Sequence, residues 1–214
     1  MQNGSVRSTV LLCLALISIV LGMLFFKMTR VPTLSDEQLR EKGVVVLPTP
    51  RELAPFELLD QRGEPFSVEN LQGRWSFVFF GFTHCPDICP TSMSVLAQAR
   101  RQIEEQHPNL LDGFNGVLIS VDPERDTVEA MARYVGAFSP HFVGATGEHA
   151  AIAQLATSVN VAFGKVPDGQ GGYTVDHTGN IIILNPYGHY HGFIKMPHEP
   201  ETVREAYVTL QDGF

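Results

Sequence analysis

The sequence is poor in cysteine and in positive charge, and each shortage argues against a class of protein. Three cysteines among 214 residues cannot form the framework of a disulfide-rich scaffold. The 15 lysine and arginine residues are outnumbered by 23 acidic residues, so the composition offers no basic footprint for nucleic acid. Because 44% of the residues are hydrophobic and only 18% are charged, the composition also argues against intrinsic disorder.

The N-terminal segment, residues 1–30, is predicted to be a short tail and a transmembrane anchor. Val10–Phe26 contains no charged residue, and a helix of this length spans roughly 25 Å, the short end of what crosses a bilayer. A cleaved signal peptide is the alternative, but bulky residues stand where its cleavage site needs small ones. Arg7 on one side and Lys27 and Arg30 on the other nearly balance the positive-inside count. These residues alone therefore leave the orientation open.

Residues 31–46 are predicted to form a membrane-proximal helix and linker. Ser35 is a candidate N-cap, and Gln38 stands three residues later, as a capping box requires. Gly43 is expected to end the helix. The prolines in Leu47–Pro50 then predict an extended connector.

The remainder, residues 47–214, alternates strand and helix patterns and is predicted to be one domain. Apolar runs predict strands at 76–82, 116–121, 142–145, 180–184 and 188–194. Helical periodicity predicts helices at 91–106, 127–138, 148–159 and 201–210. This order implies an α/β fold with three layers, in which helices cover both faces of a central sheet.

The first predicted strand of this domain runs into a motif with two cysteines. Cys85 and Cys89 lie between the strand end and Pro90, which suits the first turn of a helix. Their spacing across such a turn suits either a redox-active pair that forms a disulfide or two thiolates holding one soft ion. The helix dipole is expected to lower the pKa of Cys89. Two inert structural thiols are the less favoured interpretation.

A soft ion held by two thiolates needs a further ligand, and imidazole is a natural third. His177 is one of eight candidates, and it lies in a predicted loop directly before an apolar strand. A later stretch rich in soft ligands contains His189, His191, Met196 and His198. The polar face of an edge hairpin explains that stretch better than a second metal site does, and no role is assigned to it.

Three motifs in order resemble the Sco/SenC family of copper-binding assembly proteins. They are FGFTHCPDICP, VDPERDT and YTVDHT, and the similarity covers about residues 47–212. The resemblance implies a thioredoxin-like fold with a central mixed sheet, tethered by one transmembrane helix. It also implies one copper ion, Cu(I) or Cu(II), bound by Cys85, Cys89 and His177. By the same resemblance, the domain faces the periplasm from the inner (cytoplasmic) membrane.

The function implied by this resemblance is that of a membrane-anchored copper metallochaperone. Its partner would be cytochrome c oxidase subunit II or a related copper-receiving protein. A thiol–disulfide oxidoreductase that keeps the cysteines of that protein reduced is the alternative, because the same fold and cysteine pair support it. A peroxidase and a redox or copper sensor are less favoured. Since copper needs both thiols reduced, a disulfide and a loaded site exclude each other.

Three further residues are candidates for supporting roles. Asp122 and Arg125 of VDPERDT are expected to cap the helix that starts at Thr127 and to anchor its loop at least as readily as to tune the site. Asp176 is a candidate to orient the adjacent His177.

Overall fold

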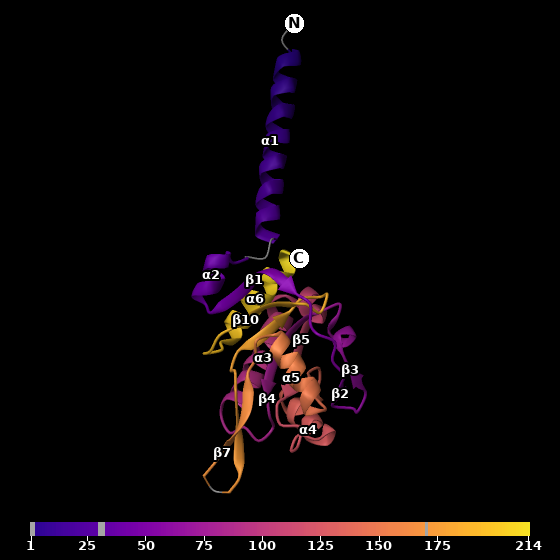
Figure 1. Ribbon diagram of the computed structural model, residues 1–214. Helices are drawn as coiled ribbons and strands as arrows, with labels where there is room; N and C mark the ends of the chain where they lie inside the picture. The colour runs from indigo at the N-terminus through magenta and orange to yellow at the C-terminus, as the bar shows by residue number, and fades with distance from the viewer. Residues whose placement is uncertain (1–2, 30–32, 170) are drawn as a thin grey trace. The chain divides into compact units, whose positions relative to one another are not determined.

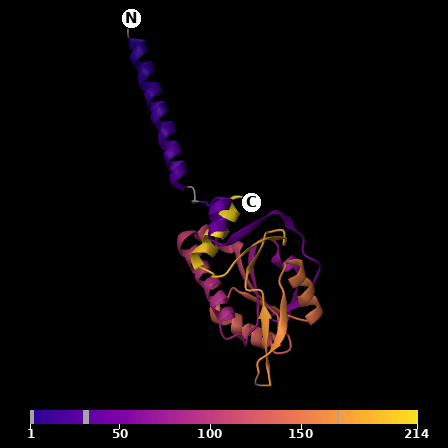
Figure 2. The same ribbon diagram turned by 60° about the vertical axis from the view of Figure 1, so that its left-hand side comes forward.

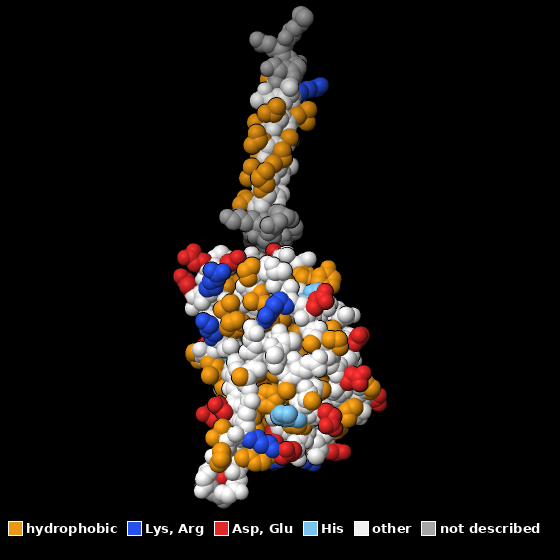
Figure 3. All heavy atoms as spheres, viewed as in Figure 1, with side chains coloured by type: hydrophobic (Ala, Val, Ile, Leu, Met, Phe, Trp, Pro, Cys, Tyr) orange, Lys and Arg blue, Asp and Glu red, His pale blue; other side chains and the backbone are white. Residues whose placement is uncertain are grey.

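The N-terminal apolar run forms one helix, α1 (Asn3–Thr29). Its segment Val6–Leu24 is long and apolar enough to cross a membrane, judged by length and composition. Hydrophobic side chains line the helix in Figure 3. Of the charges that flank the predicted span, Arg7 is exposed, whereas Arg30 and the side chain of Lys27 lie outside the described residues.

The computed structural model describes residues 3–29, 33–169 and 171–214. Its internal contacts divide the chain into two units, Met1–Thr33 and Leu34–Phe214. The elements of the second unit are, in chain order, α2 (Asp36–Glu41), β1 (Val44–Arg51), β2 (Leu58–Asp60), β3 (Pro65–Phe66), η1 (Val68–Leu71), β4 (Trp75–Gly81), α3 (Ile88–Gln106), η2 (Pro108–Gly113), β5 (Phe114–Ser120), α4 (Val128–Phe138), β6 (Val143–Thr146), α5 (His149–Ser158), β7 (Phe163–Pro167), β8 (Tyr173–His177), β9 (Ile181–Leu184), β10 (Tyr190–Ile194) and α6 (Pro200–Asp212). Figure 1 shows their arrangement.

Eight strands form one mixed sheet in the order β1-β10-β9-β4-β5-β6-β2-β3. The central strands β4, β5 and β6 run parallel, whereas β9 lies antiparallel to β4. Every residue of β4 and of β5 is buried, as expected for central strands covered on both faces. The parallel strands β4 and β5 therefore end at the same edge, where the cysteine motif follows.

Helices cover both faces of this sheet, as predicted. Alternate residues of β4 point to opposite faces, because side chains alternate along a strand. On one face the ring of Phe77 meets Tyr207 of α6, which packs beside α3. On the other face Val78 and Phe80 line a small cavity together with Leu155 of α5. The cysteine motif thus begins where a fully buried central strand ends.

Two predictions near the start of this unit have different outcomes. The capping box of α2 is confirmed, since Ser35 accepts from the Gln38 N–H (3.3 Å) and Gln38 Oε1 accepts from the Ser35 N–H (2.9 Å). Leu47–Pro50 is extended as predicted, but it belongs to strand β1 and is not a connector. That strand lies at the sheet edge and pairs with β10 alone, a position that tolerates the missing N–H groups of Pro48 and Pro50.

Strands β7 and β8 form a separate two-stranded ribbon that the sequence patterns did not predict. Its register runs from Phe163 opposite His177 to Pro167 opposite Tyr173. Figures 1 and 2 show this ribbon, in orange, extending beyond the rest of the unit. Gly169, Gly171 and Gly172 lie between the two strands. His177 is therefore the last residue of a ribbon strand and not a loop residue.

Candidate metal centre

The cysteine motif joins the end of β4 to the start of α3. Cys85 lies in the connecting turn, where its N–H donates to the Phe82 carbonyl (3.3 Å), and it is partly exposed. Cys89 is the second residue of α3 and is 0% exposed. A Cβ on Gly81 would lie 2.9 Å from Cys89 Sγ, so this glycine lets the sulfur approach the end of the central strand.

One buried carboxylate ties the turn to the body of the domain. Asp126, 0% exposed, accepts from Thr83 Oγ1 (2.6 Å), from the Thr83 N–H (3.1 Å) and from Ser120 Oγ (2.7 Å). Because Ser120 ends β5, the turn is fixed to the neighbouring strand. Neither Thr83 nor Asp126 was singled out from the sequence, although Asp126 belongs to VDPERDT.

The other part of the cluster comes from the ribbon. Beyond His177, the Thr178 N–H donates to the Ala162 carbonyl (2.9 Å), which closes the base of the ribbon. The imidazole of His177 meets the rings of Phe79 and Phe82 edge-on, with centroids 5.7 and 6.0 Å away. Phe79 and Phe82 are buried residues on the side of the site that carries the cysteines. Their rings therefore hold the imidazole against that side.

The orientation of this imidazole follows from its hydrogen bond. His177 Nδ1 lies 3.2 Å from the Thr178 carbonyl oxygen, which can only accept, so the ring proton sits on Nδ1. That tautomer leaves the lone pair of Nε2 free, and Nε2 lies 3.5 Å from Cys89 Sγ. The Thr178 carbonyl, and not Asp176, is thus the orienting partner.

Cys85, Cys89 and His177 converge on one place. Their ligand atoms all lie within 4.8 Å of one another. Cys89 and His177 are separated by 88 positions in the sequence, so only the fold brings them together. Two sulfurs and one imidazole form a donor set that suits a soft or borderline ion.

Burial sets the protonation of the cluster. It raises the pKa of the Cys89 thiol, and the neighbouring Cys85 adds to this rise. The predicted lowering is therefore wrong, because desolvation of the anion outweighs any stabilisation by the helix dipole. Burial lowers the pKa of His177, although its bond to the Thr178 carbonyl opposes the shift. The imidazole is thus neutral and able to bind a metal at neutral pH.

Comparison with known proteins agrees with this geometry. A family model described as SCO1/SenC matches residues 47–211. The chain belongs to the SCO1/SenC family. The resemblance inferred from the three motifs is confirmed.

Individual members of the SCO1/SenC family show how far the similarity extends. A Stutzerimonas stutzeri protein that is named as copper-binding is 36% identical over 82% of this chain and 84% of its own length. The human mitochondrial SCO2 homolog is 41% identical over 71% of this chain, and the match spans 56% of the human protein. The crystal structure of Arabidopsis thaliana ScoI with copper bound is 34% identical, with a TM-score of 0.70 over 75% of this chain and 98% of that one. The thioredoxin-like fold class is confirmed by such structures.

The second motif of the SCO1/SenC pattern anchors the ribbon. Arg125 forms an ion pair with the buried carboxylate of Asp122 and donates from Nη1 to the Tyr173 carbonyl (3.2 Å). Its guanidinium also lies 4.1 Å from the centroid of the Tyr173 ring, whose hydroxyl donates to Asp122 Oδ1 (2.9 Å). The ion pair shows the loop anchoring expected of Asp122 and Arg125, and Arg125 also anchors the strand that carries His177. The expected capping of the next helix is wrong, because the N-cap of α4 is Thr127 itself.

The fold places the four residues of the stretch rich in soft ligands in two separate regions. His191 packs against Trp75, and His189 against Tyr187, at the part of the domain where β4 begins. Met196 and His198 instead contact residues beside the cysteine cluster. The hairpin interpretation fits the two histidines on the β10 side, but the predicted edge position is wrong, because β10 pairs with both β1 and β9. The interpretation fails for Met196 and His198, which lie beyond β10.

Proposed function

We propose that this chain is a membrane-anchored copper metallochaperone that binds one copper ion through Cys85, Cys89 and His177. The observation that carries this proposal is the convergence of two sulfurs and one neutral imidazole within 4.8 Å. Copper in the names and titles of the relatives supports the choice of metal. Copper is here the cargo that the protein carries.

The donor set explains why copper would be both held and released. Two thiolates and a neutral imidazole give Cu(I) a near-trigonal soft site with a net charge of about −1. Cu(II) would make the same site neutral and favour an additional oxygen ligand, for which Asp87 and water are candidates. Copper binds the two sulfurs as thiolates, and a Cys85–Cys89 disulfide contains no thiolate. The disulfide therefore excludes copper, and the redox state of the pair controls loading.

Membership of the family supports a proposal for the recipient and the location. The Sco family is linked to assembly of cytochrome c oxidase. We infer delivery to subunit II of that oxidase, or to a related copper-receiving protein. Residues 1–30 would anchor the protein in the inner (cytoplasmic) membrane, 31–46 would form the membrane-proximal segment, and 47–214 would face the periplasm as the copper-binding domain.

Copper titration of the reduced full chain in detergent micelles tests this proposal. His177→Ala is expected to weaken copper retention against a chelator about a hundredfold or more, because one of three metal bonds is lost. His189→Ala is the matched control and is expected to bind like the wild type, since this imidazole packs against Tyr187. The proposal fails if wild-type protein does not retain one copper, or if His177→Ala retains it equally well.

A thiol–disulfide oxidoreductase is the second candidate, and the unequal exposure of the two cysteines favours it. Partly exposed Cys85 could attack a disulfide of the partner, and buried Cys89 could then resolve the mixed disulfide. In that reaction Cys85 and Cys89 lose two electrons and two protons as their disulfide forms. The disulfide of the partner takes up both and becomes two thiols. His177→Ala would leave this activity intact, so the same variant separates the two candidates.

A further inference from the structure

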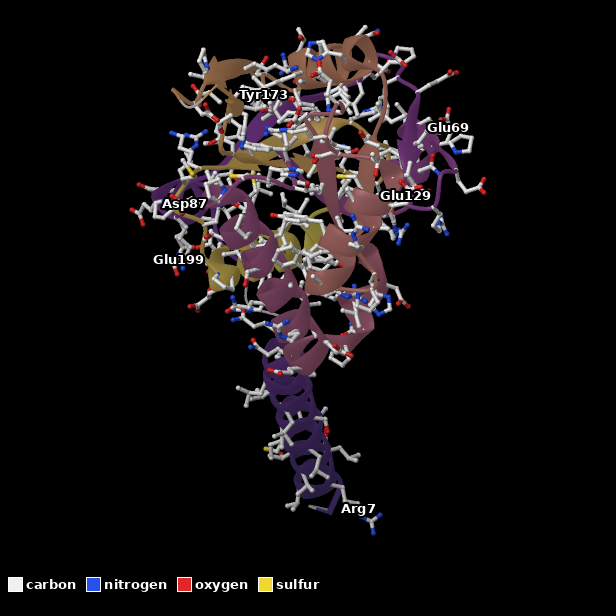
Figure 4. All side chains as sticks on the ribbon, turned by 90° about the horizontal axis from the view of Figure 1, so that it is seen from below. Arg7, Glu69, Asp87, Glu129, Tyr173 and Glu199 are labelled. Atoms are coloured by element: carbon white, nitrogen blue, oxygen red, sulfur yellow. The ribbon has the colours of Figure 1, made fainter. Side chains whose placement is uncertain are left out.

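The segment that follows β10 lies against the proposed copper site. Lys195 begins this segment, and the imidazole of His198 within it reaches helix α3, where its Nδ1 lies 3.0 Å from Ser92 Oγ. Ser92 is three residues beyond Cys89 on the same helix. Asp87 directly precedes helix α3, and Glu199 directly follows His198. Both residues are labelled in Figure 4, where they lie on the same side of the domain.

His198 fixes this segment to the wall of the site. Its ring meets Phe79 edge-on at 6.1 Å between centroids, and His177 meets that same phenyl ring. The segment is therefore held beside the imidazole of the proposed copper site by one hydrogen bond and one shared aromatic neighbour.

Met196 is the residue that this anchoring places at the rim. A Cβ on Gly179 would lie 2.8 Å from Met196 Sδ and 2.9 Å from its methyl carbon. The same point is 2.8 Å from Cδ1 of Ile88, the residue before Cys89. The thioether thus occupies the space left by a glycine two residues beyond His177, next to the start of α3.

The exposure of Met196 distinguishes it from a core methionine. The residue is 53% exposed, whereas Met93 and Met131 of this domain are 0% exposed. A thioether is a neutral soft ligand that favours Cu(I) over harder ions. A half-exposed methionine beside one partly exposed and one buried cysteine is suited to be the first contact for an arriving ion.

We propose that Met196 is an auxiliary thioether ligand that receives Cu(I) at the rim and passes it to Cys85, Cys89 and His177. This inference rests on the proposed copper-binding function and names the route by which that site is loaded.

The transfer is a ligand exchange without electron transfer. Cu(I) leaves a ligand of its donor and binds the lone pair of Met196 Sδ, which carries no proton. A sulfur of the cysteine pair then displaces the thioether, and each thiol releases its proton to solvent as its Cu–S bond forms. Copper remains Cu(I) throughout, and Met196 is free again after the exchange.

Stopped-flow transfer of Cu(I) from its bicinchoninate complex to the reduced full chain in detergent micelles tests the route. Met196→Leu keeps the apolar cover but removes the sulfur, and it is expected to slow uptake about tenfold without changing the equilibrium affinity. Met131→Leu makes the same chemical change where the side chain packs near Gly144 of β6, and it is expected to load at the wild-type rate.

Three outcomes would overturn the proposal. Met196→Leu could load as fast as the wild type. It could lose affinity as well as rate, which would make Met196 a retaining ligand. Loading could also be slow in Met196→Ala but not in Met196→Leu, which would mean that the side chain is only an apolar cover.

A second measurement keeps the test separate from the proposed function. In protein with ¹³C-labelled methionine methyl groups and Cys85→Ser and Cys89→Ser, Ag(I) is expected to shift the Met196 methyl resonance and not that of Met131. This result does not require copper retention by the cysteines. If the wild type fails to retain copper, the proposed function falls, whereas an unshifted Met196 methyl overturns only the thioether ligand.

Discussion

The two sides of the candidate metal centre are built differently. Cys89 belongs to the core, since it is 0% exposed and follows a central strand in which every residue is buried. His177 ends a two-stranded ribbon outside the main sheet, and most residues of that ribbon are exposed or half-buried. Local opening requires less free energy where few apolar contacts are lost. We therefore expect copper to be released by movement of the ribbon while the cysteine side stays folded.

The largest effect expected from this difference is the dependence of copper affinity on pH. Burial raises the pKa of Cys89, so this thiol keeps a proton that copper must displace. Copper binding should therefore tighten as the pH rises from 6 to 8, by about a hundredfold for each thiol that stays protonated over this range. Burial lowers the pKa of His177, so its proton contributes less to this slope than the thiol protons do. Chelator competition at several pH values, corrected for protonation of the chelator, measures this dependence.

The same series with His177→Ala checks which side carries the protons. The variant should bind more weakly at every pH, with nearly the slope of the wild type. A much flatter slope in the variant would mean that the imidazole, and not the thiols, takes up the proton.

The cysteine side could be predicted from sequence because its signals are local. A continuous apolar run, two cysteines and Pro90 specify a strand, a turn and a helix start within 16 residues, 75–90, and the structure follows them. The pKa of Cys89 was predicted wrongly, because burial depends on the whole fold and a local pattern contains only the helix dipole.

The ribbon side was less predictable because its signals are weak or distant. Gly164 and Pro167 interrupt the strand pattern of β7, and Gly169 and Gly171, with φ values of 75° and 90°, were not recognised as its turn. His177 was singled out from eight histidines by family resemblance and not by its spacing. Asp176 was considered as its orienting partner, although the acceptor that its Nδ1 contacts is a backbone carbonyl, which no sequence pattern reveals.

A smaller effect is expected from crowding the cysteine side. In Gly81→Ala the new Cβ would lie 2.9 Å from Cys89 Sγ and 3.0 Å from Cε1 of Phe79. We expect the free energy of unfolding to fall by about 1–3 kcal/mol, since the buried sulfur and ring must shift. Copper affinity should fall with it by about tenfold. Denaturant midpoints and chelator competition measure the two quantities.

Gly136→Ala is the matched control for this crowding. Gly136 lies in α4, and a Cβ there would meet nothing within 4 Å. Because alanine favours a helix over glycine, this variant should be as stable as the wild type or slightly more stable, with unchanged copper binding. Equal behaviour of the two variants would contradict the close approach of Cys89 to the strand end.

The smallest effect should come from loosening the ribbon alone. Tyr173→Phe removes the hydroxyl that donates to Asp122 Oδ1 but keeps the ring beside Arg125. Loss of one such hydrogen bond costs about 1 kcal/mol, which corresponds to about fivefold in affinity. This loss should appear as faster copper dissociation with little change in the unfolding midpoint, because the ribbon contributes little to the core. Tyr187→Phe, at a 63% exposed position, should change neither quantity. If Tyr173→Phe instead lowers the unfolding midpoint as Gly81→Ala does, the ribbon is part of the cooperative core, and release must involve both sides of the site.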